Sequence, residues 1–399
     1  MKATRVLILL FLLWNWLPNV SAQTGDSISY QQYNDLLRII ENGKLRRIQK
    51  LIDSVGIAAP VQGEVMLKHS AITVSYNPQH RQANYVVHIL PKDILFGNFT
   101  RSNDFRPDPL LKIPAADSAD YWMSGYDRGH LAPSADFKWS KKALSESYLY
   151  SNISPQHPAF NQGAWSKLEM LTREWAIQNQ EIIIVTGPVL HDSLPKIPQG
   201  SKQLSVPAQF FKIALDYYPP DYKAIAFLYP NAPVPLRLPQ HVVSIDSIEQ
   251  LTGIDFFPQL EDSLEQALEQ QHALQDWEPD YKEEISDEEL KAKSFGKGKI
   301  NSFQAKDYIE KEACVCGKVV STKYHQNGSS NPTYINLDKR FPDQVFTLII
   351  YGSARKNFSY EPETYLVGKT VCVKGKVGQF KGTPQIIANR EKDVEILKD

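Results

Sequence analysis

The chain has 399 residues, with 42% hydrophobic and 22% charged side chains and a net charge of −1. This composition is typical of a globular protein and excludes a disordered or collagen-like chain. A chain of this length is expected to form two folded units joined by a linker. Its near-neutral charge provides no overall field to attract a polyanion, so nucleic-acid binding must come from local placement of basic residues.

Residues 1–22 have the pattern of a signal peptide. Lys2 and Arg5 precede an apolar run at 6–17, and residues 20–22 (Val-Ser-Ala) provide small side chains at a cleavage position. The apolar run is too short for a predicted membrane span. These features predict an exported protein, periplasmic or secreted, with no membrane-spanning segment.

The next part of the chain predicts an α+β domain. Residues 23–63 are expected to be helical, with Asn42 and Gly43 separating two short helices. Strand-like apolar runs and helical patterns then follow without regular alternation, so residues 64–260 are predicted to form a mixed or antiparallel sheet with helices. The strand-like runs lie at 71–77, 84–90, 181–190, 210–218 and 223–230, and the helical patterns at 154–173 and 244–257.

A strongly acidic segment follows this domain. Residues 261–293 carry 12 acidic and 3 basic side chains, a net charge of −9, and 261–300 is interpreted as a linker that is at most partly helical. Residues 301–399 carry a net charge of +4 and contain five strand-like runs, with one short helix between the third and the fourth. This pattern predicts a small five-stranded β-barrel of the OB-fold type.

All three cysteines, Cys314, Cys316 and Cys372, lie in this C-terminal domain. They permit at most one internal disulfide, between Cys372 and either of the other two. The alternative is that they are small buried apolar side chains. A Cys-x-Cys pair with no histidine or cysteine cluster near it in the sequence is a poor zinc site.

Two polar motifs carry the chemistry. Residues 126–137 read YDRGHLAPSADF, and residues 149–169 read LYSNISPQHPAFNQGAWSKLE. Taken alone, the first motif is most simply a charged loop whose polar groups pair with one another. In the second motif, Asn161 and Glu169 are predicted near one face of a continuous helix, about 12 Å apart along its axis. One histidine, one amide and one carboxylate suit hydrated Mg²⁺ and do not suit zinc.

The order of these motifs, together with RSNDFRPDP at 101–109 and VTGP at 185–188, resembles the DNA/RNA non-specific endonucleases of the ββα-metal superfamily. The resemblance covers about residues 65–260 and implies a ββα-metal nuclease domain. It implies that His130 is the general base, that Asn161 is the protein ligand of the metal ion, and that Glu169 holds a metal-bound water.

The resemblance also implies supporting residues. Asn152 helps to shape the site, and Arg128 and Arg101 contact phosphate, with Arg106 as the alternative to Arg101. The expected metal is Mg²⁺, with Mn²⁺ as the alternative. If His130 keeps the ordinary pKa of a histidine, near 6.5, activity is expected to fall as the pH drops through that range.

The predicted function is that of an exported, Mg²⁺-dependent endonuclease that cuts DNA and RNA. Two other interpretations are a non-catalytic nucleic-acid-binding protein on a nuclease scaffold and a phosphodiesterase for another substrate. The OB-like domain is expected to bind single-stranded nucleic acid, unless its aromatic side chains fill the core and its basic ones only face solvent. The candidate side chains are Tyr324, Tyr334, Phe346, Tyr351 and Phe380 for stacking, and Lys339, Arg340, Lys374, Lys376 and Lys381 for phosphate.

Overall fold

The fold is given by a computed structural model, in which the chain divides into two compact units, Met1–Arg47 and Ile48–Asp399. The structure describes residues 29–397 except 93–96, 98, 180, 202, 219–221, 235–236, 279–284, 286, 326–329, 342 and 381. The predicted signal peptide therefore lies outside the described residues, as does Lys381. No helix within the described ranges is both long and apolar enough to cross a bilayer.

The N-terminal helical segment is one helix rather than two. Helix α2 runs from Tyr30 to Val55 without a break at Asn42 and Gly43. A glycine inside a helix costs only about 1 kcal/mol relative to alanine, so in a helix of 26 residues it does not enforce a break. The prediction of two short helices is wrong for this reason.

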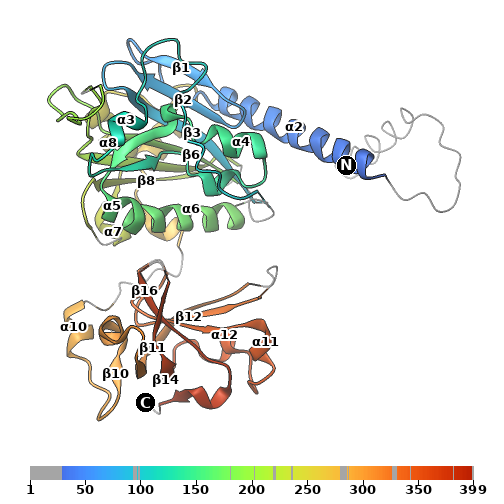
Figure 1. The fold of residues 1–399 in the computed structure, drawn as a ribbon, viewed down its shortest axis with the longest axis vertical. Helices are drawn as coiled ribbons and strands as arrows, with labels where there is room; N and C mark the ends of the chain where they lie inside the picture. Colours follow the sequence, from blue (N-terminus) through green and yellow to red (C-terminus); the bar gives the residue numbers. More distant parts are fainter. Residues whose placement is uncertain are drawn as a thin grey trace, which may run out of the picture. The chain divides into compact units, whose positions relative to one another are not determined.

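The first sheet has seven antiparallel strands in the order β1-β2-β3-β6-β7-β8-β9 (Figure 1). It contains all five strands predicted for this part of the chain. Strands β3 and β6 are buried along their whole length, and their sequences are rich in apolar residues, although β3 also buries Gln82, Asn84 and His88. The strands are β1 Val65–Lys68, β2 Ile72–Asn77, β3 Gln82–Pro91, β6 Glu181–Pro188, β7 Gln209–Asp216, β8 Lys223–Pro230 and β9 Val242–Val243.

Helices and a separate strand pair surround this sheet. Helix α6 (Ser166–Gln178) packs against β3 and β6 through a buried face that includes Leu168 and Trp175 (Figure 1). Strands β4 (Asp127–His130) and β5 (Ile153–Gln156) form a two-stranded sheet of their own. The other elements are α3 Ser118–Tyr121, η2 Ser134–Phe137, α4 Lys141–Glu146, η3 Tyr150–Asn152, α7 Leu238–His241 and α8 Ile245–Thr252.

The described residues 261–278 of the acidic segment are packed, not extended. They form helix α9 (Asp262–Glu269) and the 3-10 turn η5 (Leu274–Asp276). The ring of Trp277 lies 5.0 Å from that of Trp175 on α6, and both rings are buried. This part of the acidic segment therefore belongs to the packing of the first sheet.

The second sheet lies in the C-terminal part of the chain, drawn in orange and red in Figure 1. Its strand order is β15-β16-β13-β12-β11-β14-β17, with β10 paired to β11; β13 is parallel to β16 and β10 to β11, and the other pairs are antiparallel. Among the described residues this order is an open path, so the closed five-stranded barrel is not confirmed. The strands are β10 Ile300–Asn301, β11 Glu312–Tyr324, β12 Thr333–Leu337, β13 Thr347–Ile350, β14 Thr370–Lys376, β15 Gly378–Phe380, β16 Thr383–Ile387 and β17 Val394–Ile396.

The five strands expected here appear as β11, β12, β13, β14 and β16. The additional strands have two or three residues, too few to show a hydrophobic period. Where one helix was expected, between β13 and β14, there are two short ones. The helical elements are α10 Asp287–Ala292, η6 Ser302–Tyr308, α11 Gly352–Arg355, α12 Pro362–Tyr365 and η7 Glu391–Asp393.

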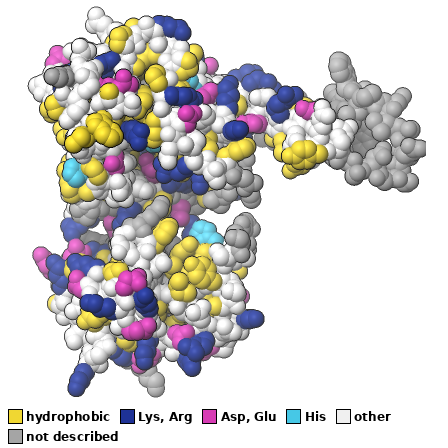
Figure 2. Space-filling model, in the orientation of Figure 1, with side chains coloured by type: hydrophobic (Ala, Val, Ile, Leu, Met, Phe, Trp, Pro, Cys, Tyr) yellow, Lys and Arg dark blue, Asp and Glu magenta, His cyan; other side chains and the backbone are white. Residues whose placement is uncertain are grey.

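The overall class, α+β with antiparallel sheets, agrees with the prediction. On the face shown in Figure 2, acidic and basic side chains are interspersed over the C-terminal part, so its positive net charge is not gathered into one patch there. The structure also decides between the two disulfides that the sequence permits, because Cys316 is bonded to Cys372 and Cys314 is free.

Candidate active site

The DRGH motif is strand β4, and its partner β5 fixes the backbone of the site. Asp127 faces Gln156 and His130 faces Ile153 across the antiparallel pair. A Cβ atom on Gly129 would collide with the side chain of Gln156. The motif therefore needs glycine at this position so that the two strands can approach.

The chain then passes from β5 into an irregular helix that carries Asn161. Helix α5 (Pro158–Phe160) continues into the π-helical turn η4 (Asn161–Trp165), and regular α-helix begins only with α6 at Ser166. Gly163 has φ −100° and ψ −111°, which is not helical. Asn161 and Glu169 thus do not lie on one regular helix, and the expected 12 Å axial separation does not apply. π-turns are frequent at functional sites, but periodicity does not reveal them.

His130 is buried at the end of β4, with 9% of its surface exposed. Its ring lies 5.0 Å from that of Tyr148 and 5.4 Å from that of Phe105. Among the described residues, its Nε2 atom has no hydrogen-bond partner. Burial lowers the pKa of His130 to about 3, and the positive charges of Arg101 and Arg128 add to this effect. The imidazole is therefore neutral at physiological pH, and the expectation of an ordinary pKa near 6.5 is wrong.

Arg101 and Arg128 are the two arginines whose charges act on His130. Both arginines are exposed, and each contacts an aromatic side chain. The Nε of Arg101 donates to the hydroxyl of Tyr148 at 3.3 Å, and the guanidinium of Arg128 lies 4.1 Å from the ring centre of Phe105. The structure therefore brings both predicted phosphate contacts close to the histidine.

Arg106, the alternative to Arg101, has other partners. Its Nη1 donates to the carboxylate of Asp104 at 2.8 Å and to the carbonyl of Ser145 at 2.9 Å. These bonds hold the loop that carries Arg106 against helix α4 and use its Nη1. Of the two candidates, Arg101 is thus the one placed beside the histidine.

Asn161 is oriented by Asp127, the first residue of the DRGH motif. The Oδ2 atom of Asp127 accepts hydrogen bonds from Nδ2 of Asn161 at 2.8 Å and from Nε2 of Gln162 at 2.9 Å. Because the amide nitrogen of Asn161 is held in this way, its Oδ1 atom is the one presented to a cation. Asp127 thus links the strand that carries the histidine to the turn that carries the amide.

Asn152 positions the backbone that follows His130. Its Oδ1 accepts from the backbone N–H of Ala132 at 2.9 Å, and its Nδ2 donates to the carbonyls of Ala132 and Ser147 at 2.9 and 2.8 Å. The residue is 1% exposed. Its side chain therefore holds the backbone after His130 and does not face solvent.

Glu169, in the first turn of α6, is only partly exposed and lies among charged residues. Burial raises the pKa of its carboxyl group, whereas the charges of Lys212, Arg173 and Arg101 oppose that rise. Arg101 is therefore within electrostatic range of both His130 and Glu169, which places these side chains around one site.

Lys212 on β7 is the buried counter-charge of Glu169. It is 1% exposed, its Nζ donates to Oγ1 of Thr186 at 2.7 Å, and it lies 4.7 Å from the ring centre of Trp165. Burial lowers the pKa of this lysine, and the carboxylate of Glu169 opposes that shift. The sequence offered one signal that was missed, because Lys212 is the only charged side chain inside the apolar run FFKIAL.

A second group of buried or partly buried ionisable residues, formed by Asp136, His88 and Arg173, lies next to Glu169 and Lys212. The carboxylate of Asp136 accepts from Nε2 of His88 at 2.9 Å and from Nη1 of Arg173 at 2.6 Å. Burial alone would raise the pKa of Asp136, but Arg173 and His88 outweigh it and hold the pKa below its usual value. Arg173 follows Glu169 by four residues on α6, so helical spacing could have identified it.

The residues of the site can hold a hard cation. The Oδ1 atom of Asn161 and the carboxylate of Glu169 are oxygen donors, the type of ligand that Mg²⁺ prefers. Neither Asn161 nor Glu169 is fully buried, so water can complete the coordination. The donor set therefore fits a cation that keeps several of its waters.

Residues 49–263 match the DNA/RNA non-specific endonuclease family, which is more than half of the chain. The fold and the site define a nuclease-type hydrolase, and the chain belongs to this family. Nucleases of this family are metal-dependent. This confirms the family resemblance.

Individual relatives cover the same region. The chain is 31% identical over 229 residues to the mitochondrial nuclease EXOG of Danio rerio, which is 54% of this chain and 66% of that protein. It is 35% identical over 215 residues to the mitochondrial endonuclease G of Bos taurus, covering 50% of this chain and 71% of that protein. A crystal structure of an EndoG/EndoGI complex matches 54% of this chain and 94% of that chain, with 24% identity and a TM-score of 0.49.

These comparisons contradict the predicted location. The matched EXOG and endonuclease G proteins and a nuclease of Saccharomyces cerevisiae are mitochondrial, and a nuclease of the bacterium Nostoc also matches. The prediction of an exported, periplasmic or secreted protein conflicts with them and is wrong. A charged and apolar N-terminal stretch is a feature of several targeting signals, so it was insufficient to decide between compartments.

Proposed function

We propose that this chain is a Mg²⁺-dependent endonuclease that hydrolyses the phosphodiester bonds of both DNA and RNA. The observation that carries the proposal is His130, a buried and neutral imidazole whose Nε2 has no partner among the described residues. The positive charges of two arginines lower its pKa. Asp127, on the same strand β4, is hydrogen-bonded to Asn161. The description of the matching family supports both DNA and RNA as substrates.

In this proposal His130 takes a proton at Nε2 from the attacking water. The low pKa keeps the imidazole neutral at neutral pH, so that Nε2 can act as the acceptor, although the same shift makes His130 a weaker base than an ordinary histidine. Arg101 and Arg128 bind the phosphate oxygens, because a fixed guanidinium forms charge-assisted hydrogen bonds with them. Asn152 keeps the backbone after His130 in place through three hydrogen bonds.

Asn161 and Glu169 hold the metal ion in this proposal. Asn161 binds it through Oδ1, in the orientation set by Asp127, and Glu169 holds one of its waters. When bound, the ion supplies Lewis-acid stabilisation of the leaving oxygen and of the charge that develops on the phosphate. The donors are few and are all oxygens, a set that suits Mg²⁺ and also admits Mn²⁺.

A plasmid-nicking assay with and without EDTA tests the activity, and Asn161→Ala tests the metal ligand. We expect the chelator to abolish nicking, and Asn161→Ala to lower the Mg²⁺ affinity measured by calorimetry. Gln178→Ala, at the exposed last residue of α6, is the control and should leave both unchanged. A chain that binds DNA without cutting it would be a non-catalytic binder, and cleavage of only another phosphodiester would identify a different substrate.

We also propose the domain limits 64–260 and 301–399, and that the second of these domains binds single-stranded nucleic acid. The first sheet lies within 64–260, and the second begins with β10 at Ile300, one residue before the second limit, which supports both limits as those of the sheets. Phe380 is 63% exposed and supports stacking, but Phe346 is fully buried in the core and cannot stack on a base. Lys339 is also buried and paired with Asp287, so it is not a phosphate ligand.

Phe380→Ala in the full chain tests this second role. We expect the KM for long single strands to rise several-fold, with kcat and the melting temperature unchanged, because a tethered binding surface raises only the local substrate concentration. Tyr365→Ala, at an exposed aromatic residue on α12, is the control. An unchanged KM in Phe380→Ala would exclude this surface.

A further inference from the structure

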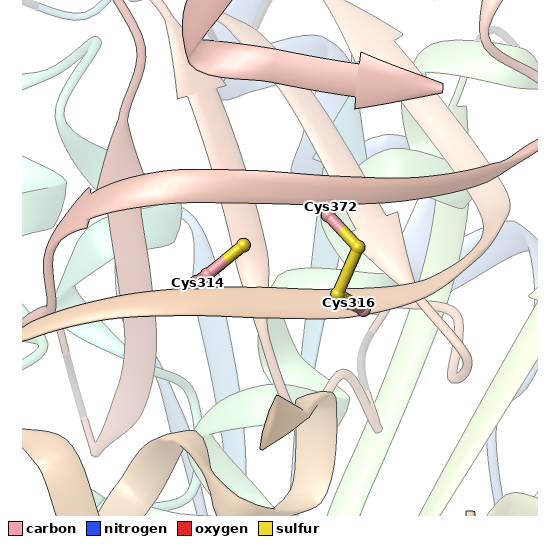
Figure 3. A group of neighbouring side chains, drawn as sticks. All are labelled: Cys314, Cys316 and Cys372. Carbon is pink, nitrogen blue, oxygen red and sulfur yellow. A yellow bond between two sulfur atoms is a disulfide. The ribbon is translucent and has the colours of Figure 1, made fainter. Parts of the chain in front are cut away.

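The three cysteines of the chain form one cluster on two neighbouring strands. Cys314 and Cys316 lie two residues apart on β11, so they share a face of the sheet, and Cys316 is directly opposite Cys372 on β14 (Figure 3). The three Sγ atoms all lie within 4.8 Å of one another. The third sulfur comes from a position 56 residues away, which is why the sequence showed only an isolated Cys-x-Cys pair.

The cluster lies on the face of the strand pair that points away from the hydrophobic core. The neighbours Val315, Val371 and Val373 belong to the core cluster of this domain, and alternation along the strands turns the cysteines to the other side. Cys316 and Cys372 are nearly fully buried there, whereas Cys314 is partly exposed. The cluster is thus shielded but reachable from the side of Cys314.

Two lysines place positive charge next to the sulfurs. Lys374 is directly opposite Cys314 on β14, and Lys299 acts electrostatically on the same thiol. Burial raises the pKa of Cys314, and the negative charge of Glu395 adds to that rise, whereas both lysines oppose it. Glu395, which pairs with Lys299 at 2.9 Å, faces Cys372 from β17. The two lysines therefore offset part of the effect of burial and of Glu395 on the Cys314 thiol, and binding of a shared ligand depends on the spacing of the three sulfurs.

We propose that, when the Cys316–Cys372 disulfide is reduced, the three cysteines bind one soft cation of the Zn²⁺ type through their thiolates. A dithiol reductant supplies two electrons and two protons, so that Cys316 and Cys372 become thiols and the reductant becomes a disulfide. Binding of the cation then releases the three thiol protons and leaves one coordination position for water.

The distances allow this with small movements. Zinc binds thiolate sulfur at about 2.3 Å, which puts the sulfurs of a tetrahedral site about 3.8 Å apart. Sulfurs that already lie within 4.8 Å of one another can reach this spacing by rotating their side chains. In the oxidised state two of the three sulfurs are bonded to each other and are not thiolates, so the disulfide excludes the cation.

Cobalt(II) titration of the full chain tests this site. The chain is reduced without air by a phosphine that does not chelate metals, and Mg²⁺ is present in excess. We expect a sulfur-to-cobalt charge-transfer band that saturates at one cobalt per chain and disappears when Zn²⁺ is added. The oxidised chain should show no such band. Oxygen ligands such as Asn161 and Glu169 produce none, so the nuclease site does not interfere.

Cys314→Ser is the decisive variant, because it leaves the disulfide of the oxidised chain intact. In its reduced form we expect the affinity for cobalt to fall at least about tenfold, since one of the three ligands is lost. Zn²⁺ should also raise the melting temperature of the reduced wild-type chain, or refold it if reduction unfolds the domain, and should do neither in Cys314→Ser. Absence of the band in reduced wild type, or equal binding by Cys314→Ser, overturns the proposal.

Discussion

The two sheets of this protein differ in where buried charged residues lie. On one side of the first sheet, the strands bury His88 and Lys212 close to Asp136 and Glu169. Burial of a charge costs several kcal/mol unless it is paired, so a sheet that keeps such residues does so at the expense of stability.

In the second domain, the buried charged residues Asp338 and Lys339 follow strand β12 and pair with Lys293 and Asp287. The core cluster of this domain consists of aliphatic residues and phenylalanine. The buried charges at the first sheet therefore mark the part of the molecule that carries the candidate active site.

The largest expected effect of a single substitution is that of His130→Ala. Nicking should fall by about 10²- to 10⁴-fold, the contribution of a general base. The melting temperature should fall only as far as the lost ring contacts with Tyr148 and Phe105 require, because Nε2 of His130 has no hydrogen bond to lose among the described residues. Nicking rates and thermal melts of the variant check both statements.

His191→Ala is the control for this variant. His191 is exposed and hydrogen-bonded to its neighbour Ser193 at 2.8 Å, so its removal should leave nicking unchanged. Wild-type turnover in His130→Ala would remove the residue from the mechanism. A large fall in melting temperature would instead show that His130 has a structural role, like a core residue of the second sheet.

Asp127→Ala is expected to have the next largest effect. The substitution removes the acceptor that orients the amide of Asn161. Loss of a residue that orients a metal ligand typically costs 10- to 100-fold in affinity or activity, so we expect about that loss in Mg²⁺ affinity. Higher Mg²⁺ should partly restore nicking. Calorimetry that shows the wild-type affinity would contradict the role of Asp127 as the residue that positions Asn161.

The pH dependence separates the two buried groups of the site. His130 has a pKa of about 3, so it stays deprotonated and does not limit the rate between pH 5 and 8. The pKa of Glu169 is raised by burial, so protonation of its carboxylate is expected to cause the loss of activity on the acid side. Lys212 opposes that rise, and Lys212→Met should therefore move the acid limb to higher pH.

Rate–pH profiles of the wild type and of Lys212→Met from pH 5 to 9 measure this shift. We expect a several-fold lower rate in the variant at pH 6 and a smaller difference at pH 9, where the carboxylate is ionised in both proteins. Superimposable profiles would show that Lys212 does not act through Glu169. Thermal melts identify any loss of rate that comes from unfolding.

The sequence predicted the elements of the fold better than the electrostatics of the site. Runs such as 84–90 and 223–230 were readable as strands because they are short and rich in β-branched, aromatic and other apolar residues. The two-residue strands β9 and β10 were not readable, since they depend on pairing with distant partners. The disulfide was undecided for the same reason, because only the register of β11 with β14 places Cys316 opposite Cys372.

Within the candidate site, the motifs located His130, Asn161 and Glu169, but not what surrounds them. The low pKa of His130 comes from burial and from arginines that the fold brings to it. Lys212 lies 43 positions after Glu169, and no spacing rule joins them. Local pattern therefore identifies reactive side chains, whereas their protonation depends on contacts between segments distant in the chain.

The smallest effect on nicking is expected from the core of the second sheet. Leu348 on β13 is fully buried, between Ile335 of β12 and Ile386 of β16. Leu348→Ala should lower the free energy of unfolding of this domain by about 2–5 kcal/mol, because it removes buried methyl groups and leaves a cavity. The nicking rate should be unchanged at a temperature at which the domain is still folded.

Val367→Ala is the matched control for Leu348→Ala. Val367 is 51% exposed, so its truncation should change stability by no more than about 0.5 kcal/mol. Denaturant unfolding and nicking are measured on both variants. A fall in nicking by the folded Leu348→Ala protein would show that the packing of the second sheet affects the chemistry of the first. The division between a sheet that holds the site and a sheet that is only packed would then fail.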